Sequence, residues 1–202
     1  MLCPSWRLLV RGMKWLSILA ALIVGAVTLA GYFILLPNYT NRFRLTIEIE
    51  TPDGIKAGSS VIETTFWESG SWGPVEARGV RSSATGEAVF VDLGRGKNLL
   101  AILGFGPSGT DDSKIFGLTR AALALGKTIN WKDEYRLKGK GELPSDYIPT
   151  PITFADINDP RTARTLKPSD FSVVYGPGFG FRRALIETTT DPVTRGIDKK
   201  LP

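Results

Sequence analysis

Carboxylate side chains are the main candidates for chemistry in this 202-residue chain, because it contains no histidine and only one cysteine, Cys3. The lack of histidine excludes Ser-His and Cys-His catalytic pairs and imidazole metal ligands. The GxSxG, SxxK and Walker patterns of other catalytic and phosphate-binding sites are also missing. A carboxylate-dependent hydrolase of glycan or peptide would need a cleft that joins at least two of Asp133, Glu134, Glu142, Asp146 and Asp156.

The adjacent acidic residues of the sequence also have structural explanations. Asp111 and Asp112 stand where a predicted helix begins, and a helix N-terminus favours negative charge. The pair Asp133-Glu134 lies between Lys132 and Arg136, as expected for a solvated, charge-balanced surface. The sequence therefore favours a protein without catalytic activity and keeps the hydrolase as an alternative.

The run FADINDPRT places three oxygen-bearing side chains, Asp156, Asn158 and Asp159, in one predicted loop. Calcium takes six to eight oxygen ligands, and such alternation can supply some of them. The run is similar to the Asp-x-Asn-Asp element of cadherin inter-domain calcium sites, but the other acidic elements of those sites are absent. The alternative, which we favour, is a capped turn in which these side chains bond nearby backbone amides and Pro160 ends a strand.

Two aromatic residues, Trp67 and Trp72, flank a short polar stretch and form a candidate contact site for a partner. Packing of both rings into the core beneath a loop is an equally good interpretation. The glycine-rich run GPGFGF, residues 176–181, is not expected to bind phosphate, because Pro177 interrupts it and no helix is predicted directly after it. We interpret that run as a wide turn.

The net charge of +5 is divided unevenly along the chain. Arg7, Arg11 and Lys14 precede a hydrophobic segment without any acidic residue, which leaves 22 basic and 20 acidic residues, a net charge of +2, in the remainder. A remainder with both signs interspersed gives no support for nucleic-acid binding.

The hydrophobic segment, residues 15–36, has no charged residue over 22 positions and predicts a transmembrane helix. A helix of that length spans a hydrocarbon core of about 30 Å. Because basic residues precede it, the positive-inside rule places residues 1–14 in the cytoplasm and residues 37–202 outside it. The lipid bilayer is thus the first expected partner.

Two alternatives affect this anchor. A cleaved signal peptide would use the small residues Ala30-Gly31, although the apolar run continues beyond them to Leu36. Translation from Met13 would remove Cys3 and two of the three leading basic residues. Under either alternative, residues 37–202 stay outside the cytoplasm.

Alternating apolar and polar residues predict a mainly β domain after the anchor. Residues 42–51 predict a half-buried strand whose inward residues are Phe43, Leu45, Ile47 and Ile49, with Arg42 and Arg44 on the outward face. Pro52-Asp53-Gly54 predicts a turn into a second strand, residues 60–67. Residues 68–85 are expected to form a long loop or two irregular strands.

The remaining elements are fewer and shorter. Residues 86–93 and 97–105 predict a hairpin around the turn 94–96. One helix is expected from about Ser113 to Leu125, with Ile115, Leu118, Ala122 and Leu125 on its apolar face. Residues 131–151 predict an irregular crossing, and residues 171–175 and 182–190 a last pair of strands.

The predicted fold is an antiparallel β-sandwich or partly open barrel with one short helix, and an α+β fold is the alternative. The strand, Pro-Asp-Gly turn, strand and GEAVFVDLGRGKNLLAIL pattern resembles carboxypeptidase regulatory-like and transthyretin-like sandwiches over about a third of the chain.

The runs LTIEIETPDGIKAGSSVIE, GEAVFVDLG, TFADINDP, YGPGFGFRR and TTDPVTRGI resemble a group of uncharacterised bacterial membrane-anchored proteins. That resemblance implies a bacterial cytoplasmic membrane and a periplasmic domain, and it implies no activity. We therefore expect a membrane-tethered, non-enzymatic domain that binds a protein or another envelope component. The alternatives are the envelope glycan or peptide hydrolase and a calcium-dependent assembly module.

Overall fold

The computed structural model describes residues 18–28, 31, 37–69 and 78–199. The chain forms two compact units, one of residues 1–38 with 67–80 and one of residues 39–66 with 81–202. In the first unit residues 18–28 are helical, and their large apolar side chains are exposed. No helix within the described ranges is long and apolar enough to cross a membrane. The predicted span 15–36 extends outside the described residues, as do residues 1–14.

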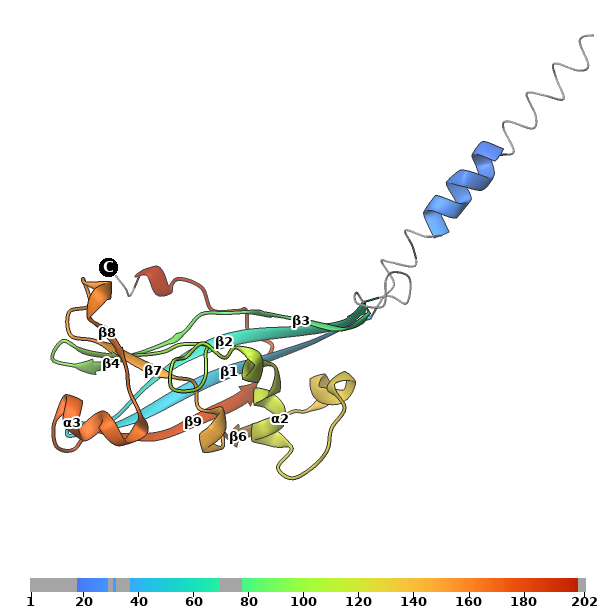
Figure 1. The fold of residues 1–202 in the computed structure, drawn as a ribbon. Coiled ribbons are helices and arrows are strands. Elements are labelled where there is room, and N and C mark those ends of the chain that lie inside the picture. The colour runs from blue at the N-terminus through green and yellow to red at the C-terminus, as the bar shows by residue number, and fades with distance from the viewer. Residues whose placement is uncertain (1–17, 29–30, 32–36, 70–77, 200–202) are drawn as a thin grey trace, which may run out of the picture. The chain divides into compact units, whose positions relative to one another are not determined.

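The second unit is mainly β, as predicted, with two antiparallel sheets (Figure 1). The five-stranded sheet has the order β3-β2-β1-β9-β6, with bounds Gly79–Thr85, Gly54–Ser69, Asn38–Thr51, Gly180–Thr188 and Lys140–Glu142. The four-stranded sheet has the order β4-β5-β7-β8, with bounds Val89–Gly94, Lys97–Ala101, Pro151–Phe154 and Ala163–Thr165. Strand β3 begins and β2 ends in the first unit.

The alternation predicted for β1 is present residue by residue. Its four inward apolar residues, Phe43, Leu45, Ile47 and Ile49, are each at most 1% exposed. Strand β9 pairs with β1 in antiparallel register, with Leu45 opposite Ile186. Burial of four large apolar side chains on one strand contributes roughly 1.5–3 kcal/mol for each of them.

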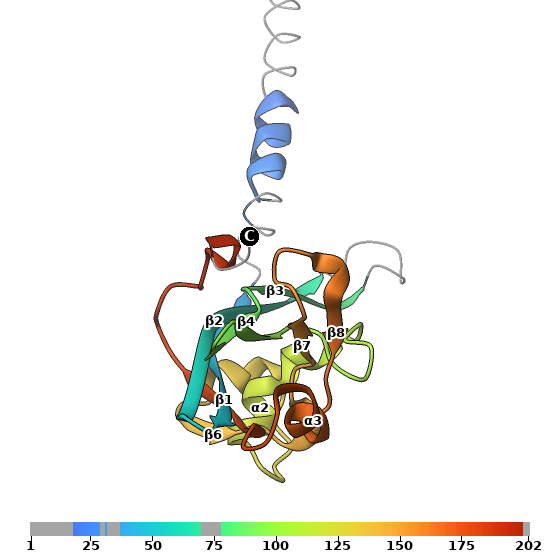
Figure 2. The same cartoon turned by 90° about the vertical axis from the view of Figure 1, so that its left-hand side faces the viewer.

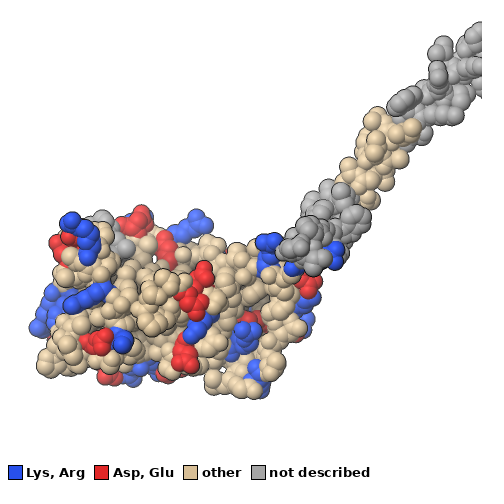
Figure 3. Space-filling model, viewed as in Figure 1, with Lys and Arg blue, Asp and Glu red and all other residues tan. Residues whose placement is uncertain are grey.

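The outer face of the five-stranded sheet carries cross-strand ion pairs. Arg42 Nε donates to Glu63 Oε2 at 2.6 Å, Arg183 Nε donates to Glu48 Oε2 at 2.8 Å, and Arg44 pairs with Asp191. These pairs explain the basic residues that follow the hydrophobic segment as parts of a charged strand face. Figure 3 shows acidic and basic side chains interspersed over the visible face of the described chain.

The core lies between the two sheets and is completed by short helices (Figure 2). The four-stranded sheet contributes Val89, Val91, Leu93, Leu99 and Ala101 to it. The helix α2, Leu118–Leu123, contacts β6 and β9, and α3, Phe171–Tyr175, contacts β9. The other helical turns are 3-10 segments: η2 (Ser113–Gly117), η3 (Trp131–Arg136), η4 (Ser145–Tyr147), η5 (Pro160–Thr162), η6 (Pro168–Asp170) and η7 (Ile197–Lys199).

The single predicted helix is broken into η2 and α2, and it is shorter than predicted. Ile115, Leu118 and Ala122 are buried as expected, whereas Leu125 is 72% exposed. The helix ends at Leu123 because Ala124 leaves helical geometry and Gly126 has a φ of 72°. The prediction that Leu125 faces the core was therefore wrong.

The strand predicted at residues 171–175 is the helix α3, which makes two short helices in the described part of this unit instead of one. Phe171 and Tyr175 are both buried, whereas Val173 between them is 85% exposed. A strand would place all three side chains on one face, so this pattern is that of a helix. The carboxylate of Asp170 accepts a hydrogen bond from the Lys167 amide at 3.0 Å and stabilises the preceding turn. Because residues 171–175 are helical, they are not the strand partner that was expected for β9. Strand β9 pairs with β1 and β6 instead.

Strand β2 runs further than predicted and contacts the other sheet. Within residues 68–85, expected to form a long loop or two irregular strands, residues 68–69 continue β2 and residues 79–85 form β3. A Cβ atom on Gly58 of β2 would overlap the carbonyl oxygen of Phe90 in β4. Only glycine allows the two sheets to approach at this point.

We predict that Gly58→Val lowers the free energy of unfolding by about 2 kcal/mol or more, because the new side chain forces β2 away from β4. Denaturant unfolding of the full-length protein measures this change. Ala57→Val is the matched control, since Ala57 is exposed on the same strand and its substitution should change stability by less than about 0.5 kcal/mol. Equal effects of the two substitutions would contradict the close approach.

Candidate functional site

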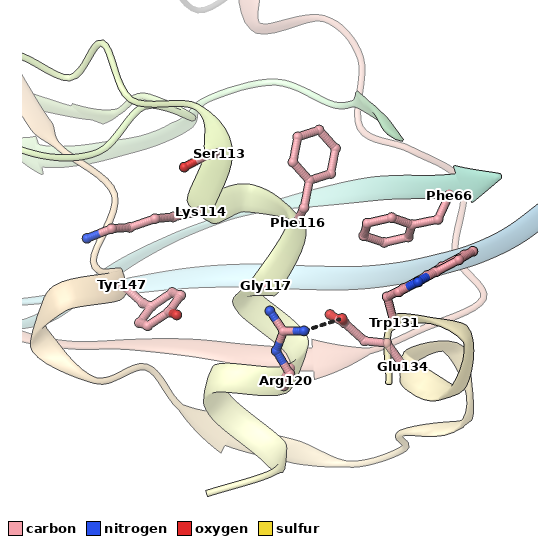
Figure 4. Close-up of a pocket in the computed structure, with 9 residues that line it drawn as sticks. All are labelled: Phe66, Ser113, Lys114, Phe116, Gly117, Arg120, Trp131, Glu134 and Tyr147. Carbon is pink, nitrogen blue, oxygen red and sulfur yellow. Dashed lines mark ion pairs between the residues drawn. The ribbon is translucent and has the colours of Figure 1, made fainter. Parts of the chain in front are cut away.

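A pocket of about 230 Å³ lies in the second unit between β2, η2, α2, η3 and η4 (Figure 4). We call it the aromatic pocket. It is lined by Phe66, Ser113, Lys114, Phe116, Gly117, Arg120, Trp131, Glu134 and Tyr147. A volume below the ~300–1,000 Å³ of pockets for drug-sized ligands suits one small ring or one side chain.

A buried hydrogen bond fixes the helix that carries Arg120. Asn41, the first inward residue of β1 before Phe43, donates from Nδ2 to the hydroxyl of Thr119 at 2.7 Å. Both residues are at least 97% buried, and Arg120 follows Thr119 directly on α2. The start of β1 thereby sets the position of one charged group of the pocket.

Gly117 keeps the floor of the pocket open. A Cβ atom at this position would lie 3.2 Å from Nη2 of Arg120 and 3.6 Å from Cε1 of Tyr147. Figure 4 shows Arg120 on one side of Gly117 and Tyr147 on the other. Any larger residue would therefore narrow the pocket and displace the guanidinium group.

Aromatic rings form one wall. The Phe66 ring lies 5.8 Å from the Phe116 ring and 6.0 Å from the Trp131 ring, measured between centroids. Tyr39, at the start of β1, supports Trp131 from behind with an edge-on contact at 5.4 Å. Such pairs favour fixed ring positions, so this wall is preorganised.

The turn η3 directs Glu134 into the protein and leaves Asp133 outside. The Asn130 side chain caps the turn by accepting a hydrogen bond from the Lys132 amide at 3.0 Å. Glu134 then falls on the same side as Trp131, three residues earlier, and only 2% of it is exposed. Asp133 is half exposed and pairs with Arg136 at 2.9 Å.

Glu134 is a buried carboxyl group without a hydrogen-bond donor for one of its oxygens. Its Oε2 atom accepts no hydrogen bond within the described chain and forms only a long ion pair, at 3.9 Å, with Nη1 of Arg120 (Figure 4). Burial raises the pKa of Glu134, while the charge of Arg120 and its backbone amide act in the opposite direction. An unsatisfied buried polar atom lowers the stability of the folded protein by about 1–3 kcal/mol. We therefore expect this oxygen to accept a hydrogen bond from a ligand when the protein functions.

Arg120 is available to a ligand. Its side chain is 41% exposed, and the 3.9 Å separation from Glu134 is too long for a hydrogen bond. Across the pocket, Lys114 Nζ donates to the backbone oxygen of Asp146 at 2.8 Å and lies 5.7 Å from the Tyr147 ring. Ser113 donates its hydroxyl proton to Asp111, which leaves the Ser113 oxygen able to accept.

A larger groove of about 410 Å³ lies on the other side of Lys114, and it is lined by Asp146, Thr150, Lys167 and Asp170 among others. Two of its polar side chains are already engaged: Thr150 donates to the backbone oxygen of Gly106 at 2.7 Å, and Asp170 accepts from the Lys167 amide and the Ser169 hydroxyl. We therefore regard the aromatic pocket as the better candidate site.

The structure separates the carboxylates proposed for hydrolysis. Glu134 lines the aromatic pocket and Asp146 lines the larger groove. The remaining three, Asp133, Glu142 and Asp156, line neither of these two cavities. Each cavity therefore contains at most one of the five residues.

The loop predicted to bind calcium has the bonds of a capped turn. Asp156 Oδ1 accepts from the Asn158 amide at 2.9 Å, and Asp159 Oδ1 accepts from the Arg161 amide at 3.0 Å. The Arg161 guanidinium also binds both oxygens of Asp159 and lowers the pKa of that carboxyl group. In the part of the chain that is described, no three acidic, cysteine or histidine residues cluster as a metal site would require. Calcium binding by Asp156, Asn158 and Asp159 stays a prediction.

Of the two tryptophans predicted as a contact site, Trp67 is among the described residues and Trp72 is not. Trp67 lies near the end of β2 and is half-buried. Trp72 lies outside the described residues. Contact of a partner with this pair also stays a prediction.

No protein-family model, curated protein or solved structure matches this chain. The chemistry of the aromatic pocket must therefore be argued from its own side chains.

Glu134 is one of the five carboxylates that the sequence singles out, but the sequence does not reveal the pocket around it. The pocket residues come from five segments between positions 66 and 147, and their meeting depends on the tertiary fold. One local signal was available: Trp131 and Glu134 are three residues apart, the spacing that places side chains on one face of a helical turn.

We predict that the stability of the wild type falls relative to Glu134→Gln as the pH rises. The folded protein holds the Glu134 proton more tightly than the unfolded chain, whose ordinary pKa is 4.5. The resulting stabilisation is fully present below that value and is lost as the pH rises through the higher folded pKa. Unfolding free energies measured from about pH 4 to about pH 7 test this difference.

The control is Asp133→Asn, which removes the same charge one residue away on the surface and should keep the decline of the wild type. Parallel pH profiles for the wild type and Glu134→Gln would show that Glu134 is not buried as described.

Proposed function

We propose that this protein is a membrane-tethered, non-enzymatic envelope domain that binds a protein or another envelope component through the aromatic pocket. The observation that carries the proposal is the Oε2 atom of Glu134, which accepts no hydrogen bond within the described chain, forms only a long ion pair with a half-exposed guanidinium, and lies beside an aromatic wall. A preorganised apolar surface with a few converging polar groups is the usual composition of a ligand site.

The pocket is a better site than the loops expected from the sequence. In the loop of residues 156–160 the acidic oxygens already accept bonds from their own loop. In the aromatic pocket, by contrast, an acceptor and a multiple donor stand close together without satisfying each other. A ligand gains most binding free energy where it supplies hydrogen bonds that buried polar groups lack.

The hydrolase remains the second candidate, because a buried glutamate with a raised pKa is suited to act as a general acid. Glycoside hydrolysis ordinarily uses two carboxyl groups on either side of the bond that breaks. Glu134 is the one carboxylate among the lining residues of the pocket. Binding without catalysis accounts for that composition more simply.

Tethering is the other half of the proposal and is supported by the 22 uncharged residues of segment 15–36 and the basic residues before it. The domain then lies in the periplasm of a bacterium. A reporter enzyme that works only outside the cytoplasm should be active when it is fused after Pro202. Activity of a cytoplasm-specific reporter at the same position would contradict this topology.

Site-specific photocrosslinking in cells tests the binding site. A photoreactive amino acid at Ser113, an exposed position on the pocket rim, should form an adduct that Glu134→Gln weakens and Asp133→Asn preserves. The matched control position is Val173, which is 85% exposed on α3 and lines none of the cavities described above. Equal adducts at Ser113 and Val173, or no effect of Glu134→Gln, would refute binding through the pocket.

A further inference from the structure

The opposite charges of Arg120 and Glu134 disfavour both a cationic and an anionic ligand. Arg120 and Glu134 lie 3.9 Å apart, so a cationic group that approaches Glu134 also meets the guanidinium of Arg120. An anionic group that approaches Arg120 meets the carboxylate of Glu134. Repulsion between like charges is strongest beside the buried Glu134 and weaker beside the half-exposed Arg120. The other charged lining residue, Lys114, already donates to the backbone oxygen of Asp146. At the Arg120–Glu134 pair, electrostatics therefore favours a neutral group.

The hydrogen-bonding groups favour a hydroxyl. The acceptor Oε2 of Glu134 needs a donor, and Arg120 offers N–H groups that need an acceptor. A hydroxyl group donates one hydrogen bond and accepts others, so it can satisfy both residues at once. A purely apolar ligand would displace water and leave both groups unpaired, at a cost of about 1–3 kcal/mol for each.

The aromatic wall favours a ring with an apolar face. The wall consists of the rings of Phe66, Phe116 and Trp131, all of which line the pocket. The centroid of the Phe66 ring lies within 6.0 Å of the centroids of the other two rings. Figure 4 places the polar groups of Arg120 and Glu134 on one side of Gly117, and Ser113, Lys114 and Tyr147 on the other. A matching ligand carries hydroxyls around its rim and C–H groups on its faces.

From these three features we infer that the aromatic pocket binds a neutral sugar ring of an envelope glycan. This inference rests on the proposed function and specifies its ligand. A hydroxyl of the sugar accepts from the half-exposed Arg120 and donates to Oε2 of Glu134, which is buried in the free pocket and is uncovered by a shift of the Arg120 side chain. One face of the ring packs against the aromatic wall. An asparagine or glutamine side chain of a protein partner is also neutral, but its polar group lies at one end and reaches only one side of the pocket.

Two trisaccharides with the same backbone, one neutral and N-acetylated and the other deacetylated and cationic, test the inference together with neutral hexose trisaccharides that lack the acetyl groups. The full-length protein is placed in phospholipid nanodiscs, which avoid detergents with sugar headgroups, and titrated with chitotriose by calorimetry and saturation-transfer NMR. Chitotriose is neutral, whereas its deacetylated form carries amino groups and is cationic. We expect chitotriose or a neutral hexose trisaccharide, cellotriose or maltotriose, to bind, and the deacetylated form to bind at least about 10-fold more weakly.

Variants tie the binding to the pocket. Glu134→Gln and Trp131→Ala should each weaken the binding of the neutral trisaccharide by about 10-fold or more, because one removes a charge-assisted hydrogen bond and the other an aromatic face. Gly117→Ala should weaken it by narrowing the floor. Asp133→Asn should leave it unchanged.

Failure of all three neutral trisaccharides to bind, stronger binding of the deacetylated form, or insensitivity to Glu134→Gln would overturn the sugar inference. The crosslinking experiment then separates the two proposals. A protein adduct at Ser113 that depends on Glu134 would keep the proposed function and replace the sugar by a protein side chain. Loss of both sugar binding and the Ser113 adduct would reject the pocket as a binding site.

Discussion

The inner face of β1 is the constraint on which the rest of the second unit depends. Its four apolar residues, Phe43 to Ile49 at alternate positions, are almost completely buried and face the core between the two sheets. Because side chains alternate along a strand, this burial forces Arg42, Arg44 and Glu48 to the opposite face, where they form ion pairs with β2, β9 and Asp191. One strand thus determines both the core and the charged surface.

The candidate site lies where this apolar face gives way to polar residues. The inward position before Phe43 is Asn41, whose bond to Thr119 holds α2 in place and with it Arg120. Tyr39, two residues earlier, supports Trp131 on η3, the turn that carries Glu134. The start of β1 therefore positions both charged residues of the pocket through two separate contacts. A carboxyl group held there with an unpaired oxygen lowers stability, as functional groups in binding sites commonly do.

How much could be predicted from the sequence depended on how local the governing interaction is. The strand β1 and the β4–β5 hairpin were predictable, because alternation and glycine turns act over neighbouring residues. Helix α3 was not, because the apolar run of residues 171–175 fits either periodicity until Phe171 and Tyr175 are seen in the core and Val173 is seen exposed. Glu134 looked like a surface residue among charged neighbours, and only the packing of η3 against Tyr39 and Phe66 shows that it is buried.

The central claim is that Glu134 is a carboxyl group buried without a full set of hydrogen bonds, and its own titration tests this most directly. Carbon-13 NMR of the Glu134 side-chain carboxyl, assigned by comparison with Glu134→Gln, gives the pKa in the full-length protein. We predict a pKa above the ordinary glutamate value of 4.5, because burial outweighs the attraction of Arg120. A pKa at or below that value would show a solvated or fully paired carboxylate and would contradict the burial of Glu134 without a full set of hydrogen bonds.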